Sequence, residues 1–155
     1  MLTQLSRLAL DSDGRYASAE ELQFLKDYIQ TAPQRALAYQ TIRDQEAFLL
    51  DELYTQAKTT DGGSLFKGTQ DVSNFFKRDQ KHVLRVASAS MLFNDLDFLR
   101  EGLLLWHRTV IKAFGVERPA QVACQVWPNV MGKYLSTDEV SFMSPVVGLI
   151  RAILG

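Results

Sequence analysis

The sequence has little cysteine, little histidine and almost no net charge. The single cysteine, Cys124, excludes a disulfide within the chain and points to an intracellular protein. The 17 basic and 18 acidic side chains leave a net charge of −1, which argues against a general affinity for nucleic acids or anionic membranes. No apolar run reaches about 18 residues, and the first residues lack a secretory signal. We expect a cytoplasmic protein with no nucleic-acid partner and no membrane insertion.

Motifs for catalysis and for metal binding are also missing. The sequence contains no glycine-rich phosphate loop, no G-x-S-x-G turn and no H-E-x-x-H helix. His82 and His107 lie far apart, and neither has another metal ligand at a suitable spacing. We therefore predict that the protein is not an enzyme and holds no metal, with both histidines at the surface or satisfied in the interior. One alternative stays open, a haem bound by His107, which requires an apolar pocket around that residue.

What the sequence does contain is a regular helical pattern of apolar residues. With 155 residues, 46% of them hydrophobic, the chain is long enough for one domain around a single core. Its apolar residues recur at three- and four-residue spacing, and strand signals are nearly absent. Cys124 lies on one such apolar stripe and is interpreted as a buried small hydrophobic residue. The pattern predicts a single all-α domain over residues 1–155, with about six to eight helices.

Several local signals mark the ends of helices. Capping boxes at Ser18–Glu21 and, further on, at Ser136–Glu139 place a serine and a glutamate where they satisfy free backbone amides at a helix start. Pro33 predicts the end of the short helix that follows the first box. A second helix is predicted over residues 34–57, and a glycine-containing loop over residues 59–64.

Two long helices are predicted in the middle of the chain. The first covers residues 72–93, Asn94 and Asp95 interrupt the pattern, and the second covers residues 96–114 with Gly115 as its C-cap. The residues expected to face inward from the second helix are Leu103, Trp106, Val110 and Phe114.

Three prolines mark the C-terminal part. Pro119 suits the first turn of a helix that runs to about residue 135. Pro128 and Pro145 fall inside the last two helical stretches. Because a proline has no amide donor, we expect each of these two residues to kink or split its helix.

Three blocks of the sequence resemble the phycobiliproteins, and most closely the allophycocyanins. Leu10–Ser18, followed by Glu21 and Leu22, is similar to the family's N-terminal segment that opens the first globin helix. Phe76–Val86 is similar to the family's C-x-R-D-x-x-Y-Y-L-R-L/V signature in the long middle helix. Lys112–Val116 resembles the family's K-S-L-G-x-P junction. The resemblance implies a globin-like phycobiliprotein fold with an N-terminal helical hairpin outside the globin core.

The second block departs from the family's pattern at the position that carries its chemistry. In the family the first residue of this block is the cysteine whose sulfur bonds to the bilin, and here it is Phe76, which has no nucleophile. Arg78 and Asp79 match the residues that in the family contact a bilin propionate and the pyrrole N–H groups. On composition alone, this charged stretch is a solvated helix face. The resemblance therefore implies no covalent cofactor, with a non-covalent bilin at Arg78 and Asp79 as an alternative.

The N-terminal segment implies a protein partner. In the family it packs against a second subunit, where its Asp residues meet the arginine of the L-R pair. The residues that match this interface are Leu2, Leu5, Asp11, Asp13 and Arg85. A stretch as short as residues 1–16 would barely hold as a helix alone in water. We therefore expect residues 1–16 to form an interface segment and residues 17–155 to form the globin core.

Together these features predict a bilin-free phycobiliprotein-like protein of a photosynthetic cell that carries phycobilisomes. It would bind phycobiliprotein subunits or further copies of itself, as a homodimer or a larger oligomer. It would act in phycobilisome assembly, regulation or turnover, in the cytoplasm or at the thylakoid surface through phycobilisomes. The alternative is a carrier or sensor that holds a bilin or another tetrapyrrole without a covalent bond.

Overall fold

A computed structural model describes all 155 residues. The N-terminal half contains α1 (Leu2–Asp11), α2 (Gln23–Asp44), α3 (Glu46–Asp61), a 3₁₀ helix (Gly62–Leu65) and the two-residue strands β1 (Phe66–Lys67) and β2 (Gln70–Asp71). The C-terminal half contains α4 (Ser73–Leu92), α5 (Leu96–Leu99), a π-helical segment (Arg100–Leu104), α6 (Leu105–Phe114), α7 (Glu117–Tyr134) and α8 (Thr137–Leu154). Since α5, the π-helical segment and α6 are continuous, the prediction of an all-α chain with six to eight helices is confirmed.

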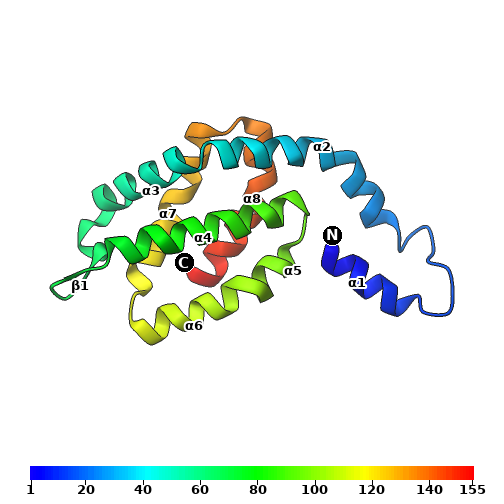
Figure 1. Ribbon diagram of the computed structural model, residues 1–155, viewed down its shortest axis with the longest axis horizontal. Coiled ribbons are helices and arrows are strands. Elements are labelled where there is room, and N and C mark those ends of the chain that lie inside the picture. The colour runs from blue at the N-terminus through cyan, green and yellow to red at the C-terminus, as the bar shows by residue number, and fades with distance from the viewer.

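The helices surround one core, and α1 stands outside it. Figure 1 shows α2 and α3 along one edge of the molecule, α4 across its middle, and the α5–α6 helix along the opposite edge. The chain runs outward along α1 and returns along α2, which forms the expected N-terminal hairpin (Figure 1). None of the residues of α1 is buried. The core side chains that are almost fully buried include Ile42, Leu49, Leu53, Val83, Met91, Leu104, Val130 and Met143.

The capping signals form as predicted. The amide of Ser136 donates to Glu139 Oε2 at 2.8 Å, and the amide of Glu139 donates to Ser136 Oγ at 3.3 Å. Ser18 and Glu21 make the same pair of bonds at 2.8 and 3.2 Å, ahead of α2. Gly115 has φ 61° and ψ 44°, the left-handed conformation that suits a glycine C-cap.

The boundaries of the middle helices also agree closely with the prediction. α4 begins and ends within one residue of the predicted range, 72–93. The helix ends just before Asn94, which has a positive φ of 49°. Asp95 then caps α5 by accepting a hydrogen bond from the amide of Phe98.

The prediction that Pro33 ends its helix is wrong, and Pro128 and Pro145 do not split theirs. Pro33, Pro128 and Pro145 lie inside α2, α7 and α8, and each helix continues through its proline. All three prolines are exposed, so water can hydrate the carbonyl that loses its amide partner. The fixed φ of proline is itself compatible with a helix.

The predicted helix over residues 34–57 is two helices instead of one. The break falls at Gln45, between α2 and α3, and α3 then continues through residue 61. The change of direction lets α3 bury Leu49, Leu53 and Ala57 against the core. The predicted loop over residues 59–64 is wrong, because residues 59–61 are the end of α3 and residues 62–64 belong to the 3₁₀ helix.

The predicted inward face of α6 is partly wrong. Leu103 is buried and Val110 is half-buried, but Trp106 is 62% exposed and Phe114 is 63% exposed. The π-helical segment that precedes α6 explains the difference, because an i→i+5 turn inserts one extra residue and rotates the helix that follows. His107 and Ile111 consequently take the buried positions.

Candidate functional site

A cavity of about 360 Å³ opens between the start of α4, the end of α6, the start of α7 and the β1–β2 hairpin. The size falls within the range of small-molecule pockets. Most of its walls are apolar, from Val72, Phe75, Phe76, Val110, Ile111, Phe114, Val116, Pro119 and Ala120. Its polar and charged lining residues are Lys67, Gln70, Arg78, Asp79, Gln80 and His107.

The β1–β2 hairpin closes one side of this cavity. Its two strands pair antiparallel, with Phe66 opposite Asp71, and Gly68 in the turn has φ 61°. The ammonium group of Lys67 donates to the carbonyl oxygen of Phe114 at 2.6 Å, which ties the hairpin to the end of α6. Segments that are distant in the sequence thus form a single rim.

Arg78 and Asp79 lie side by side on α4 and both line the cavity. The Nε and Nη2 atoms of Arg78 each donate to Asp79 Oδ1 at 3.2 Å. The Arg78 side chain is 72% exposed, and its guanidinium also lies 5.3 Å from the centre of the Phe75 ring. The pair therefore supplies a cation and an anion beside the cavity, and its contact with a tetrapyrrole, which the family resemblance implies, stays a prediction.

The attachment position of the family is buried and has no thiol. Phe76 is 5% exposed, and its ring forms part of the cavity wall. No cysteine lines the cavity. Cys124 lies in the core among residues of α4, α7 and α8, and burial raises the pKa of its thiol to about 11. Its predicted burial is confirmed.

His107 lies at the cavity wall and is 6% exposed. Burial lowers the pKa of its imidazole, although the nearby Asp79 carboxylate acts in the opposite direction. Neither ring nitrogen makes a hydrogen bond within the chain. His107 is thus an interior histidine that borders the cavity, and the mainly apolar pocket required for the haem alternative is present.

Sequence reasoning did not place Lys67 at this cavity, and it named His107 only as the ligand of the haem alternative. Lys67 and His107 belong to segments with no recognisable motif, and only the tertiary fold brings them to Arg78. Gln80 was also missed, and its Oε1 accepts a hydrogen bond of 2.9 Å from Trp127 Nε1. One available signal was the uncharged Gln80 between charged neighbours, at the helical spacing of the buried face.

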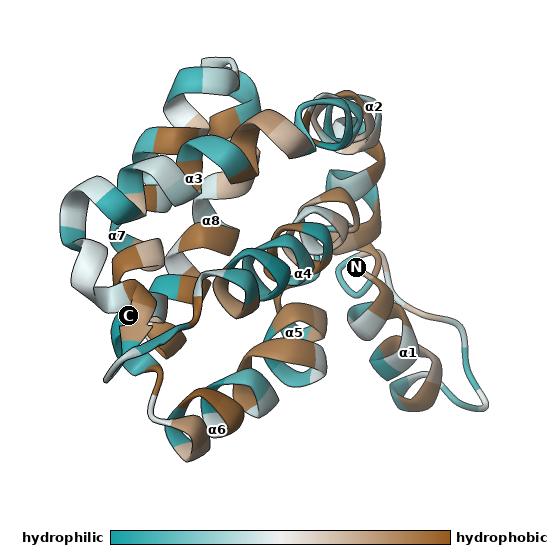
Figure 2. Ribbon diagram, turned by 60° about the vertical axis from the view of Figure 1, so that its left-hand side comes forward, coloured by the Kyte–Doolittle hydropathy of each residue, from teal (hydrophilic) through white to brown (hydrophobic).

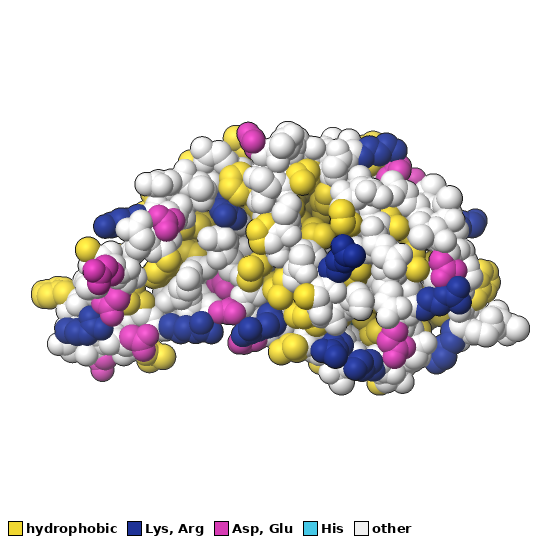
Figure 3. Space-filling model, turned by 180° about the vertical axis from the view of Figure 1, so that it is seen from behind, with side chains coloured by type: hydrophobic (Ala, Val, Ile, Leu, Met, Phe, Trp, Pro, Cys, Tyr) yellow, Lys and Arg dark blue, Asp and Glu magenta, His cyan; other side chains and the backbone are white.

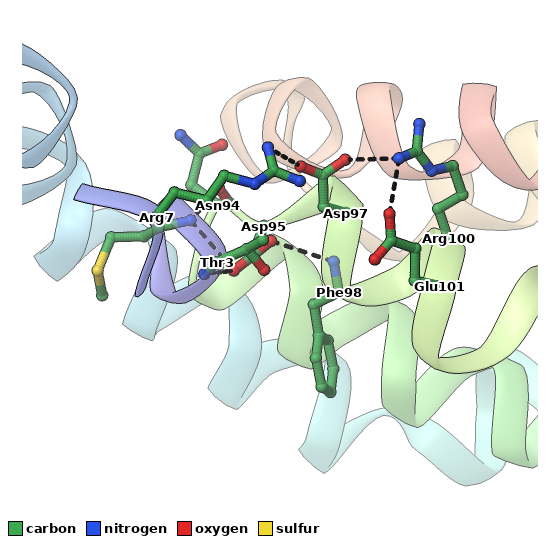
Figure 4. A network of polar contacts seen from close by, with 9 residues as sticks. Thr3, Arg7, Asn94, Asp95, Asp97, Phe98, Arg100 and Glu101 are labelled. Atoms are coloured by element: carbon green, nitrogen blue, oxygen red, sulfur yellow. Dashed lines mark hydrogen bonds and ion pairs between the residues drawn. The ribbon is translucent and has the colours of Figure 1, made fainter. Parts of the chain in front are cut away.

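A second group of polar contacts fixes the position of α1. Figure 4 shows that the start of α1 meets the turn between α4 and α5. The amide of Thr3 donates to Asp95 Oδ2 at 2.7 Å, and the amide of Phe98 donates to Asp95 Oδ1 at 3.1 Å. The amino group of Met1 donates to the carbonyl oxygen of Asn94 at 2.8 Å. Burial alone would raise the pKa of the Asp95 carboxyl, but these amide donors hold it below its ordinary value.

An exposed ion-pair network extends this contact. Arg7 of α1 lies 3.1 Å from Asp97, and Asp97 lies 3.3 Å from Arg100 (Figure 4). Surface pairs of this kind contribute little to stability. The buried carboxylate of Asp95 is therefore the main polar anchor of α1.

The predicted interface residues lie on two separate parts of the chain. Leu2 is exposed and Leu5 is half-buried on α1, and Asp11 and Asp13 are exposed at its far end. Arg85 lies on α4, where its Nε and Nη2 atoms donate to Glu46 at 2.7 and 2.8 Å. The aspartates and Arg85 make no ion pair with each other within the chain, so their expected meeting across two subunits stays a prediction.

A protein-family model matches nearly the whole chain. No curated protein matches it. None of its helices combines the length and the apolar composition needed to cross a lipid bilayer. The model of the phycobilisome protein family matches residues 8–154. The chain therefore belongs to the phycobilisome protein family and has its all-α, globin-like phycobiliprotein fold.

Proposed function

We propose that this member of the phycobilisome family works without a covalently attached bilin and acts by binding other proteins. Its partners are phycobiliprotein subunits or further copies of the chain. Its role lies in the assembly, regulation or turnover of the phycobilisome and not in catalysis. The observation that carries the proposal is α1, a helix outside the core with apolar side chains and no buried residue.

The energetics of α1 favour a partner. An isolated helix of ten residues is unstable in water, and α1 contacts the rest of the chain mainly through the turn before α5. Leu2 and Leu10 are exposed. Packing against another protein would bury these side chains and stabilise the helix.

A second apolar surface lies on the α5–α6 helix. Three of its large apolar side chains are about half exposed or more, those of Phe98, Leu105 and Trp106. In Figure 2, hydrophobic residues (brown) occur along both α5 and α6, among hydrophilic ones. Figure 3, from the opposite side, shows hydrophobic side chains reaching the surface between charged ones. Aromatic residues such as Trp106 are enriched at the centres of protein interfaces. The π-helical turn, which directs Trp106 outward, supports the same proposal.

Association is the direct test. We expect the purified protein to form a dimer or larger oligomer, or to bind purified allophycocyanin subunits, in sedimentation velocity. Leu2→Asp combined with Leu5→Asp should weaken that association at least about tenfold, since a charge would enter an apolar contact. Phe48→Asp is the matched control, because Phe48 is exposed on α3, away from α1. A protein that stays monomeric and binds no antenna subunit would contradict the proposal.

A second candidate function is non-covalent binding of a bilin, and the cavity beside Arg78 and Asp79 favours it. A bound bilin would supply light absorption, with Arg78 positioned for a propionate and Asp79 for pyrrole N–H donors. The hydrogen bond between Arg78 and Asp79 must break before both side chains can contact a bilin, because the two side chains now bond to each other. Titration with biliverdin should then change its absorbance spectrum, and Asp79→Ala should weaken binding. An unchanged spectrum would remove this candidate.

The missing thiol leads to a separate prediction about colour. In a bilin-producing host with a bilin lyase, any colour of the native chain should separate from it in acid–urea. The Phe76→Cys variant should retain colour under the same conditions, because the substitution places a thiol in the cavity wall. Colour that stays with the native chain would instead indicate attachment at Cys124.

A further inference from the structure

The imidazole of His107 has no hydrogen-bond partner within the chain. A polar side chain that is 94% buried normally has a hydrogen-bond partner, and His107 has none although it is only 6% exposed. It lies at the wall of the cavity, where the surrounding residues are mainly apolar. Its ring nitrogens are not fully enclosed, so either water or a molecule bound in the cavity can supply their partner.

The backbone places His107 at this position by an unusual turn. A regular helix through residues 96–114 would keep Trp106 on the inward side, and the π-helical segment replaces it with His107. π-helical turns are rare and occur often at functional sites. The turn thus removes the large Trp106 side chain from the interior and places there an imidazole, which is a common metal ligand in proteins.

The lining of the cavity combines one imidazole with two cationic side chains. His107 offers a nitrogen at the wall, and Lys67 and Arg78 offer two cations against the single anion Asp79. A bare metal ion would not be held, because only one nitrogen ligand faces an apolar space. An iron porphyrin carries four nitrogen donors of its own and needs one from the protein. Its carboxylates are complementary to the cations.

We propose that this cavity binds an iron porphyrin non-covalently, with an imidazole nitrogen of His107 as the axial ligand to the iron. The nitrogen replaces the water or hydroxide at one axial position of free hemin, and no oxidation or reduction is involved. The porphyrin carboxylates face Arg78 and Lys67. This ligand differs from the bilin of the second candidate function, which has no iron, and its binding is independent of the association through α1.

The test compares two ligands that differ only in the metal. Hemin and metal-free protoporphyrin are each titrated into the full chain. With hemin we expect a sharpened, shifted Soret band that saturates at one equivalent. His107→Ala should weaken hemin binding at least about tenfold and leave protoporphyrin binding nearly unchanged. Added imidazole should restore the Soret band of this variant by occupying the vacated axial position.

Two controls make the result decisive. His82→Ala should leave the hemin spectrum unchanged, because His82 is exposed on α4 and does not line the cavity. Protoporphyrin binding by the His107→Ala variant shows that the substitution keeps the cavity folded. The proposal is overturned if hemin gives no saturable spectrum, or if its spectrum is the same with and without His107. Either failure leaves the sedimentation test of protein association unaffected.

Discussion

Replacing Trp127 with alanine should lower the free energy of unfolding by about 3–5 kcal/mol, the usual cost of removing a large aromatic side chain from a core. Trp127 is 3% exposed on α7, and its Nε1 donates to Gln80 Oε1 at 2.9 Å. The substitution leaves a cavity and also leaves the buried amide oxygen of Gln80 without its donor. Both effects destabilise the fold.

The second tryptophan of the chain is the matched control. Trp106 is mostly exposed on α6, so Trp106→Ala should change the stability by no more than about 0.5 kcal/mol. Urea unfolding followed by circular dichroism measures both values. Equal destabilisation by the two substitutions would show that Trp106 faces inward, as the uninterrupted helical pattern predicts, and that the π-helical turn is absent. Loss of protein association by Trp106→Ala without loss of stability would assign this residue to the interface.

The features predicted correctly from the sequence depend on interactions between residues close together in the chain. A serine and a glutamate three positions apart are enough to form the capping box at Ser136, and the αL conformation at Gly115 needs no distant partner. The stop at Asn94 is of the same kind. The continuation of α2 through Pro33 depends instead on exposure of that turn, which a local pattern does not determine.

The residues of the candidate site likewise divide into those that a local motif identifies and those that depend on the tertiary fold. Arg78, Asp79 and the missing cysteine at Phe76 lie in one continuous motif, so the resemblance identified them, and the structure places all three at one cavity. Lys67 and His107 could not be found by that route. The position of His107 depends on the π-helical turn, and the sequence Arg-Glu-Gly-Leu-Leu that forms it has no pattern that distinguishes it from an ordinary helix.

Removing the carboxylate of Asp95 should detach α1 while leaving the core folded. Asp95→Ala deletes the cap of α5 and the acceptor of the Thr3 amide, and the loss of a helix cap costs about 0.5–2 kcal/mol. Because α1 has no buried residue, little else would hold it in place. We expect its amides to lose protection in hydrogen exchange, whereas those of α4 and α7 keep theirs. Asp97→Ala is the control, since its ion pairs with Arg7 and Arg100 are partly exposed and worth little.

Acid should have the same effect as the Asp95 substitution. The pKa of Asp95 is lower in the folded chain than its ordinary value of 3.8, so its carboxylate stabilises the fold fully above that value and progressively less as the pH falls through the folded pKa. Exchange of the α1 amides, after correction for the intrinsic pH dependence, should therefore rise in acid in the native protein and stay high throughout in Asp95→Ala. If α1 must be held in one orientation to bind a partner, association should fall with the same pH dependence. Protection of α1 that is equal in both proteins at neutral pH would show that a contact other than Asp95 anchors the helix.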